Sequence, residues 1–161
     1  AIFRGKIACK DIRVQFVEKF FGNSRFDIGT IDLIKPEWKS DKISIYDHLK
    51  YKYVMALEGN DVASNLKWIM SSNSIAVMPK PYYETWFMEG TLKPDYHYIE
   101  VKPDFSDLEE KMDYYTAHPD EAQAIINHAH EYVEQFKDKQ REDIISLMVL
   151  DKYFSLLKSK D

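Results

Sequence analysis

The sequence predicts an α/β fold in which a doubly wound parallel sheet carries helices on both faces. Short apolar runs alternate with longer segments of helical periodicity about five times along the chain, as in successive strand–helix units. Residues 53–57 form a nearly continuous apolar run, which is typical of a strand buried on both faces. No internal repeat or low-complexity linker divides the 161 residues, so we expect one domain over residues 1–161.

The expected strands are short apolar segments that stop at glycine, proline or charged residues. The first ends at Arg4-Gly5-Lys6, and the fourth is followed by Pro79 and Pro81. We assign strands to residues 1–3, 26–31, 53–57, 74–78 and 96–101.

The expected helices carry start and stop signals. Gly22 closes the first helix, Ser44 and Asp47 form a capping box, and Pro119 occupies a first-turn position. We assign helices to residues 11–21, 44–50, 62–71 and 82–89, the last of these closed by Gly90, and then from Ser106 to the end of the chain. After Pro119, one helical face gathers the apolar residues Ala122, Ile125, Ile126, Ala129 and Val133.

Composition restricts the function classes. The chain is 45% hydrophobic with a net charge of −5, which excludes a disordered segment and disfavours a nucleic-acid binder. A single cysteine, Cys9, allows no internal disulfide and no cysteine-based zinc site, so we expect a reducing compartment. No apolar run reaches the roughly 20 residues that span a bilayer, and we expect no transmembrane segment. The chain starts at Ala1 with an apolar strand, so we expect it to begin inside a longer protein.

Two loops lie where a doubly wound sheet binds ligands, beyond the carboxyl ends of its strands. Arg4-Gly5-Lys6 places two cations beside a glycine that allows close backbone approach. Residues 58–61 lead through Ser64 and Asn65 to Lys67, and the start of a helix there favours an anion. The alternative reading of this second loop is an ordinary turn with Asp61 or Ser64 as the N-cap. Neither loop matches a P-loop or a G-x-G-x-x-G fingerprint.

Other candidate residues carry weaker signals. His128 and His130 point about 200° apart on a helix and cannot share a metal, so we expect no metal site. His97 falls in an expected strand and is assigned a structural role. Glu84 and Glu89 flank an aromatic segment, where carboxylates bind sugar or ribose hydroxyls or simply remain exposed helix charges.

An ordered set of motifs strengthens the functional reading. The set comprises Y-K-Y-V-M-A-L-E-G-N at residues 51–60, S-N-L-K-W at 64–68, L-K-P at 92–94, H-Y-I-E-V at 97–101 and D-F-S-D-L at 104–108. Together with F-R-G-K at residues 3–6, it resembles the CAP10-like glycosyltransferases of family 90, most closely their bacterial lipopolysaccharide-modifying branch. The resemblance extends over nearly the whole chain.

The resemblance implies a two-lobed, metal-independent GT-B enzyme, of which this chain is the Rossmann-like C-terminal lobe. That lobe binds a UDP-sugar donor for hexosyl transfer to a saccharide hydroxyl in lipopolysaccharide or lipooligosaccharide core synthesis, with no cofactor. The acceptor lobe, which carries the base in family members, is then expected upstream of Ala1. The expected location is cytoplasmic, and peripheral attachment to the inner face of the membrane is compatible with it. The expected donor-binding residues are Arg4, Gly5, Lys6, Arg13, Glu58, Gly59, Asn60, Ser64, Asn65, Lys67 and Glu89.

One departure from the family pattern affects the phosphate anchor. Family members often carry arginine where this chain has Asn65, so Lys67, Arg4 or Arg13 has to supply the positive charge. No catalytic base is assigned. Two other classes are weighed: a non-catalytic doubly wound module that binds a nucleotide or a protein, and a receiver-type signalling domain, whose acidic cluster we do not find. The discriminating geometry is whether Arg4 and the loop at residues 58–67 line one cleft.

Overall fold

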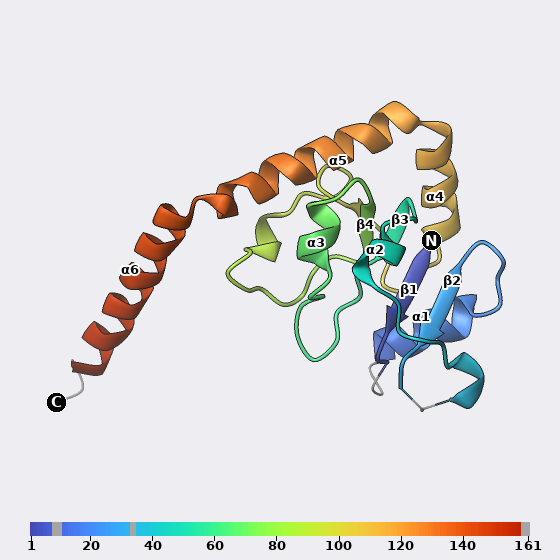
Figure 1. Cartoon of the computed structure of the whole chain (residues 1–161), viewed down its shortest axis with the longest axis horizontal. Coiled ribbons are helices and arrows are strands. Elements are labelled where there is room, and N and C mark those ends of the chain that lie inside the picture. The colour runs from blue at the N-terminus through green and yellow to red at the C-terminus, as the bar shows by residue number, and fades with distance from the viewer. Residues whose placement is uncertain (8–10, 33–34, 159–161) are drawn as a thin grey trace.

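Five parallel strands form the sheet of the computed structural model, which describes residues 1–7, 11–32 and 35–158 (Figure 1). The order across the sheet is β2-β1-β3-β4-β5, and every neighbouring pair is parallel. The predicted α/β doubly wound class is therefore confirmed. The strands are β1 (Ile2–Gly5), β2 (Asp27–Thr30), β3 (Tyr53–Met55), β4 (Ile75–Met78) and β5 (Ile99–Glu100).

The helices follow the predicted signals in most places. Ser44 caps α2, where its hydroxyl accepts a hydrogen bond from the Asp47 N–H and donates one to the Asp47 carboxylate. Pro119 opens α5, and the predicted apolar face of that helix is buried. The helices are α1 (Asp11–Phe20), α2 (Ile45–His48), α3 (Leu66–Met70), α4 (Leu108–Ala117), α5 (Pro119–Glu134) and α6 (Lys139–Lys158), with 3-10 turns at Pro36–Trp38, Glu89–Thr91 and Gln135–Lys137.

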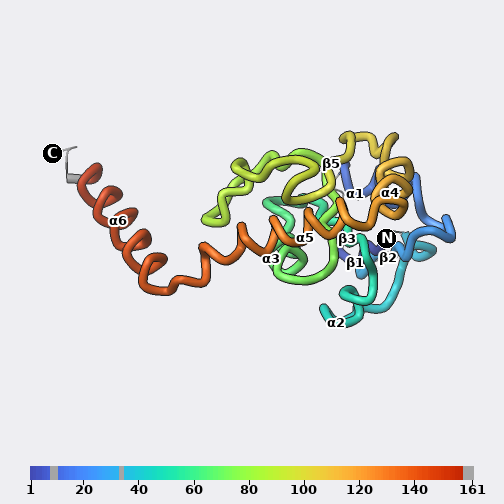
Figure 2. The backbone as a smooth tube through the Cα atoms, turned by 90° about the horizontal axis from the view of Figure 1, so that it is seen from above, coloured from blue at the N-terminus to red at the C-terminus, as the bar shows by residue number. Residues whose placement is uncertain are grey.

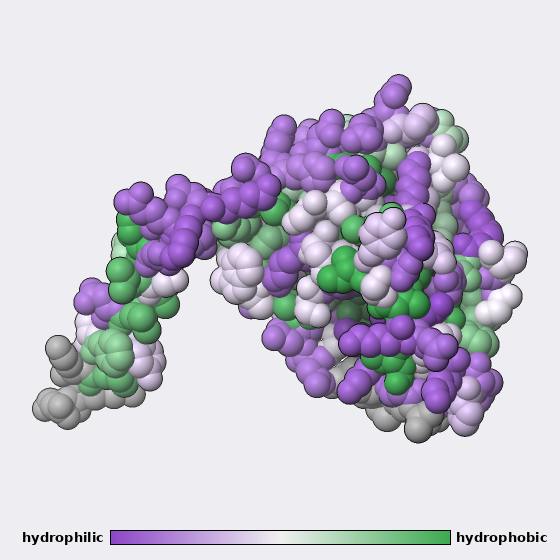
Figure 3. Space-filling view, in the orientation of Figure 1, coloured by the Kyte–Doolittle hydropathy of each residue, from purple (hydrophilic) through white to green (hydrophobic). Residues whose placement is uncertain are grey.

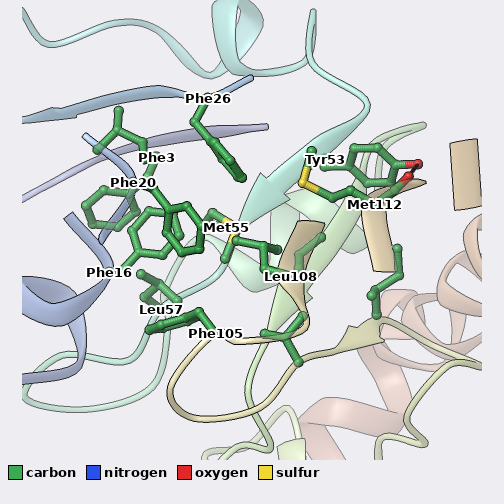
Figure 4. Packing of buried hydrophobic residues seen from close by; sticks show 14 of the residues in the cluster. Phe3, Phe16, Phe20, Phe26, Tyr53, Met55, Leu57, Phe105, Leu108 and Met112 are labelled. Carbon is green, nitrogen blue, oxygen red and sulfur yellow. Dashed lines mark hydrogen bonds between the residues drawn. The ribbon is translucent and has the colours of Figure 1, made fainter. Parts of the chain in front are cut away.

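Helices cover both faces of the sheet because successive strand residues point to opposite sides. Met55 faces one cluster, which α1, α4 and the start of α5 complete, whereas Val54 faces a second cluster completed by α3 and the rest of α5. The first cluster is rich in aromatic rings (Figure 4). Phe16 is fully buried there, 5.1 Å from Phe105 between ring centroids. Truncating such a ring typically costs about 3–5 kcal/mol of stability.

The strand order reverses direction between β1 and β3. The chain passes from β1 outward to β2, returns to pair β3 with the other side of β1, and then continues outward through β4 and β5. Doubly wound sheets bind ligands at such a switch point, in the crevice beyond the carboxyl ends of the two strands. The topology thus directs attention to the residues that follow β1 and β3.

Three predicted elements need correction. The helix expected at residues 82–89 is wrong: this segment is irregular up to the 3-10 turn Glu89–Thr91, because side chains from distant elements bind its backbone groups. The helix expected at residues 62–71 shrinks to α3, since it begins only at Leu66. The strand expected at residues 96–101 shrinks to β5, so His97 lies before the strand and its Nδ1 accepts a hydrogen bond from the Lys93 N–H.

Helix α6 leaves the body of the molecule and extends away from it (Figures 1 and 2). The apolar residues of this last helix are exposed, Ile144 by 51% and Phe154 by 54% for example. Green apolar patches follow the helix in Figure 3. Within the described part of the chain, no helix combines the length and apolar character needed to cross a membrane.

Candidate functional site

A cavity of about 290 Å³ opens at the switch point of the sheet. The end of β1 supplies Arg4, Gly5 and Lys6, the end of the β3 run supplies Leu57, and the start of α3 supplies Asn65. The cavity therefore lies where the strand order predicts a ligand. It is lined by Phe3, Arg4, Gly5, Lys6, Arg13, Ile31, Lys42, Ile43, Ile45, His48, Leu57, Ser64, Asn65 and Trp68.

The charge of this cavity is opposite to that of the chain. Arg4, Lys6, Arg13 and Lys42 line it, and no aspartate or glutamate does so among the described residues. The chain as a whole has a net charge of −5. A concave site lined by cations concentrates anions and stabilises negative charge.

Arg4 is fixed by partners on two neighbouring segments. Its guanidinium binds the Asp27 carboxylate on β2, and the Tyr51 hydroxyl donates a hydrogen bond to the other oxygen of that carboxylate. Burial raises the pKa of Asp27, but the bonds from Tyr51 and Arg4 and the charge of Arg4 outweigh it, so this pKa lies below its usual value. The Arg4 Nε is buried without a hydrogen-bond partner among the described residues, which leaves one donor unused.

Gly29 on β2 makes room for this arrangement. A Cβ added at Gly29 would lie 2.6 Å from the Arg4 Nη1 and 2.0 Å from the Ser40 Oγ, both too close for a real contact. Residue 29 must therefore lack a side chain if Arg4 is to keep its place.

Arg13 joins the two loops of the switch point. Its guanidinium donates hydrogen bonds to the carbonyl oxygens of Lys6 at 2.7 Å, Leu57 at 2.7 Å and Glu58 at 2.9 Å. Burial lowers the pKa of Arg13, while the charge of Asp32 opposes this shift. Gly59 lies against the guanidinium, since a Cβ there would sit 2.9 Å from it. Arg13 thus contributes charge to the cavity while it holds the β1 and β3 loops together.

The start of α3 contributes polar groups of a different kind. Asn65 lies at the N-cap position, but its amide donates instead to the Met55 carbonyl at 2.9 Å. Ser64 is exposed at the cavity. Helix α3 has only five residues, so the anion site expected from a helix N-terminus loses its basis, and the positive charge of the cavity comes from side chains.

Three further residues of the cavity lining were not predicted from the sequence. Lys42, His48 and Trp68 line the cavity, and the His48 and Trp68 rings lie 5.5 Å apart between centroids. The His48 Nδ1 is 2.8 Å from the Ser44 carbonyl oxygen, which fixes the ring. One signal was available for Trp68, because it lies three residues after Asn65 and therefore on the same helical face. Lys42 and His48 carry no comparable local signal.

Five of the expected donor-binding residues do not line the cavity. Lys67 points elsewhere on α3 and forms an ion pair with Glu89, with the Lys67 Nζ 2.8 Å from the Glu89 Oε1. Glu89 is 1% exposed and also accepts a hydrogen bond from the Thr85 N–H. Burial raises the pKa of Glu89, but the bonds from Lys67 and Thr85 bring it below its usual value.

The other three expected donor-binding residues outside the cavity, Glu58, Gly59 and Asn60, follow β3. The Glu58 carboxylate accepts hydrogen bonds from the backbone N–H groups of Tyr82 and Tyr83, both at 3.0 Å. Gly59 contacts Arg13, and Asn60 is exposed. Arg4 and the loop at residues 58–67 therefore share one cleft only through Ser64 and Asn65.

Among the described residues, no group of three or more His, Cys, Asp or Glu side chains is placed to hold a metal ion. The described lining of the cavity carries cations, an amide and aromatic rings.

Comparison with known proteins identifies the family. The model of glycosyl transferase family 90 matches residues 1–161. The chain belongs to this family. It is 42% identical over 160 residues to O-glucosyltransferase LpsA of Dichelobacter nodosus, which covers 98% of this chain and 50% of that protein. It is 27% identical over 168 residues to Protein O-glucosyltransferase 3 of Homo sapiens, which covers 99% of this chain and 32% of that protein.

These findings confirm the resemblance to family 90 that the motifs indicated. The chain spans about half the length of the Dichelobacter nodosus relative and about a third of the human one.

Proposed function

We propose that this family 90 chain binds the nucleoside diphosphate of a UDP-sugar donor in the cationic cavity at the β1–β3 switch point. The observation that carries the proposal is the convergence of Arg4, Lys6, Arg13 and Lys42 on a concave site without carboxylates among its described lining residues. A diphosphate is the anionic part of such a donor, and arginine suits its oxygens because of its planar fork of donors. The aromatic pair His48 and Trp68 offers a surface for the base.

The proposed reaction is hexosyl transfer. An acceptor hydroxyl oxygen forms a bond to the anomeric carbon, the bond from that carbon to the diphosphate oxygen breaks, and its electron pair stays on the leaving diphosphate. The cations of the cavity stabilise this charge without a metal ion. The acceptor proton passes to a base that we do not assign to this chain.

The sugar and the acceptor follow from the relatives and the resemblance. Because the 42% identical relative is named an O-glucosyltransferase, we propose glucose as the transferred hexose. A lipopolysaccharide or lipooligosaccharide core saccharide is the acceptor class that the sequence resemblance implies. A non-catalytic nucleotide-binding module would share the cavity but transfer no sugar.

The decisive experiment is calorimetric titration of the chain with UDP. Arg4→Ala is expected to weaken binding about ten- to a hundredfold, as befits the loss of a charge-assisted hydrogen bond. Arg141→Ala is the matched control, because Arg141 lies on the exposed helix α6 and binds the Gln135 carbonyl. Equal UDP affinity of the Arg4→Ala variant and the parent would overturn the assignment of the donor site.

A further inference from the structure

Three aromatic side chains stand exposed on the segment that follows β4. Tyr82 is 85% exposed, Tyr83 40% and Trp86 64%. We call these three residues the aromatic platform. Tyr82 and Tyr83 lie 5.1 Å apart between ring centroids, and Trp86 follows three residues later on the same segment. Contiguous exposed apolar surface of this kind marks interaction sites.

The backbone under the platform is fixed by side chains from three other segments. Glu58, after β3, binds the N–H groups of Tyr82 and Tyr83. Glu89 binds the Thr85 N–H at 2.7 Å and is itself paired with Lys67 of α3. The Tyr132 hydroxyl of α5 donates a hydrogen bond to the carbonyl of the fully buried Phe87 at 2.6 Å. The backbone that carries the exposed rings is thus held in place before any ligand arrives, which lowers the entropic cost of binding.

The flat faces of the platform rings are not stacked on other rings. Tyr82 and Tyr83 meet at 88°, and Trp86 meets Phe87 at 79° and Phe136 at 81°. Each of these contacts is edge-to-face. A hollow of about 650 Å³ opens between Trp86 and residues of α6 such as Ile145 and Val149. The Lys67 Nζ lies over the Trp86 ring, 5.8 Å from its centroid, yet Trp86 stays 64% exposed, so the platform offers exposed aromatic surface and room for a flat ligand.

The platform lies at the same edge of the sheet as the cavity. Its segment follows β4, and Glu58 ties it to the loop whose carbonyls bind Arg13. In Figures 1 and 2 the yellow-green segment after β4 lies on the side of the body from which α6 extends. None of the three platform residues lines the cavity. A ligand on the platform is thus a neighbour of the nucleotide and not a part of it.

We infer that the platform binds a pyranose ring of the saccharide acceptor, an inference that rests on the proposed function. The carbon–hydrogen face of a pyranose packs on an aromatic face, while its hydroxyls need polar partners around it. The Tyr82 and Tyr83 hydroxyls supply such partners. So does Glu84, whose exposed carboxylate makes no hydrogen bond or ion pair within the described part of the chain. Tyrosine and tryptophan are also enriched where polypeptides bind, so a peptide is the competing ligand that the test has to distinguish from a saccharide.

The experiment is saturation-transfer NMR of the 161-residue chain with maltotriose, a linear glucose oligosaccharide, in the absence of nucleotide. We expect transfer to the sugar ring protons, and we expect affinity to fall about fivefold or more in Trp86→Ala and in Tyr82→Ala, as for loss of an aromatic stacking partner. Trp86→Phe, which keeps a ring, should retain part of the binding. Tyr46→Ala is the control, because Tyr46 is 75% exposed on α2 and belongs to neither site.

Two results would overturn the inference. One is that the parent and Trp86→Ala bind maltotriose with equal affinity, or that neither binds it. The other is that a serine-containing peptide at the same concentration shows transfer that depends on Trp86 while maltotriose shows none. Calorimetry with UDP keeps the two proposals apart, since Trp86→Ala should bind UDP like the parent even if the platform binds no sugar.

Discussion

The Asp27 carboxylate binds Arg4 through one oxygen and Tyr51 through the other. Arg4 lines the cavity, whereas Asp27 does not. The direction of the arginine is therefore set by a residue on the neighbouring strand β2, and the low pKa of Asp27 keeps this partner ionised at neutral pH.

We expect Asp27→Asn to weaken UDP binding about two- to tenfold, because Arg4 loses its charged partner and is free to turn away from the cavity. The effect should be smaller than that of Arg4→Ala. Asp113→Asn is the matched control, since Asp113 on α4 forms an exposed ion pair with Arg25. Titration of both variants by calorimetry checks this. Unchanged affinity in Asp27→Asn would show that Arg4 is oriented without it.

The Arg13 guanidinium should matter for stability as well as for binding. Arg13→Lys keeps the charge, but a lysine ammonium lacks the planar set of N–H donors that binds the carbonyl oxygens of Lys6, Leu57 and Glu58. We expect a loss of about 2 kcal/mol in the free energy of unfolding, as for hydrogen bonds to a charged donor.

Urea denaturation measures this loss, with Arg25→Lys as the control at an exposed arginine. Gly59→Ala should reproduce part of the effect, because its Cβ would displace the guanidinium. A stability equal to that of the parent in Arg13→Lys would contradict the role of Arg13 as a link between the loops.

The strands and helices that hydrophobic periodicity or capping residues specify locally were predictable from the sequence. The run at residues 53–57 and the apolar face of α5 are specified by periodicity, and Ser44 and Pro119 by their helix-start chemistry. Arg4 and Gly5 were expected in a loop but form the end of β1, and together with Lys6 they lie at the carboxyl edge of the sheet, where the end of a parallel strand has to lie.

The elements and cavity residues that the sequence did not predict depend on contacts between residues far apart in the chain. The segment at residues 82–89 contains no strong helix breaker, and its irregular backbone is held by side chains: the carboxylates of Glu58 and Glu89 and the hydroxyl of Tyr132. Lys67 was expected at the cavity, yet a residue two positions after Asn65 points about 200° away from it on a helix. Lys42 reaches the cavity by tertiary packing, which no spacing rule predicts.

The Lys67–Glu89 pair should make stability depend on acid. The pKa of Glu89 in the folded chain lies below its usual value, so ionised Glu89 stabilises the fold above the unfolded pKa of about 4.3. This contribution is lost as the pH falls from there through the lower folded pKa. Tyr132, which also lies near Glu89 and whose pKa is raised mainly by burial, stays neutral in this range.

We therefore expect Glu89→Gln to be less stable than the parent by about 1–3 kcal/mol at pH 7 and to approach it as the pH falls below about 4. Glu37→Gln is the control, since Glu37 is exposed and makes no ion pair or hydrogen bond within the described part of the chain. Thermal unfolding across this pH range measures the difference. A constant difference at every pH would contradict the assigned role of the carboxylate.

Helix α6 should be dispensable for the stability of the body. Its apolar residues are exposed, and the sheet and both core clusters are complete without them. We expect a chain that ends at Asp138 to melt within about 5 °C of the parent, because little apolar area is withdrawn from the core. The shorter chain should also self-associate less, since it lacks a long exposed apolar surface. Calorimetry and analytical ultracentrifugation test both points, and a large fall in melting temperature would show that α6 packs on the body in solution.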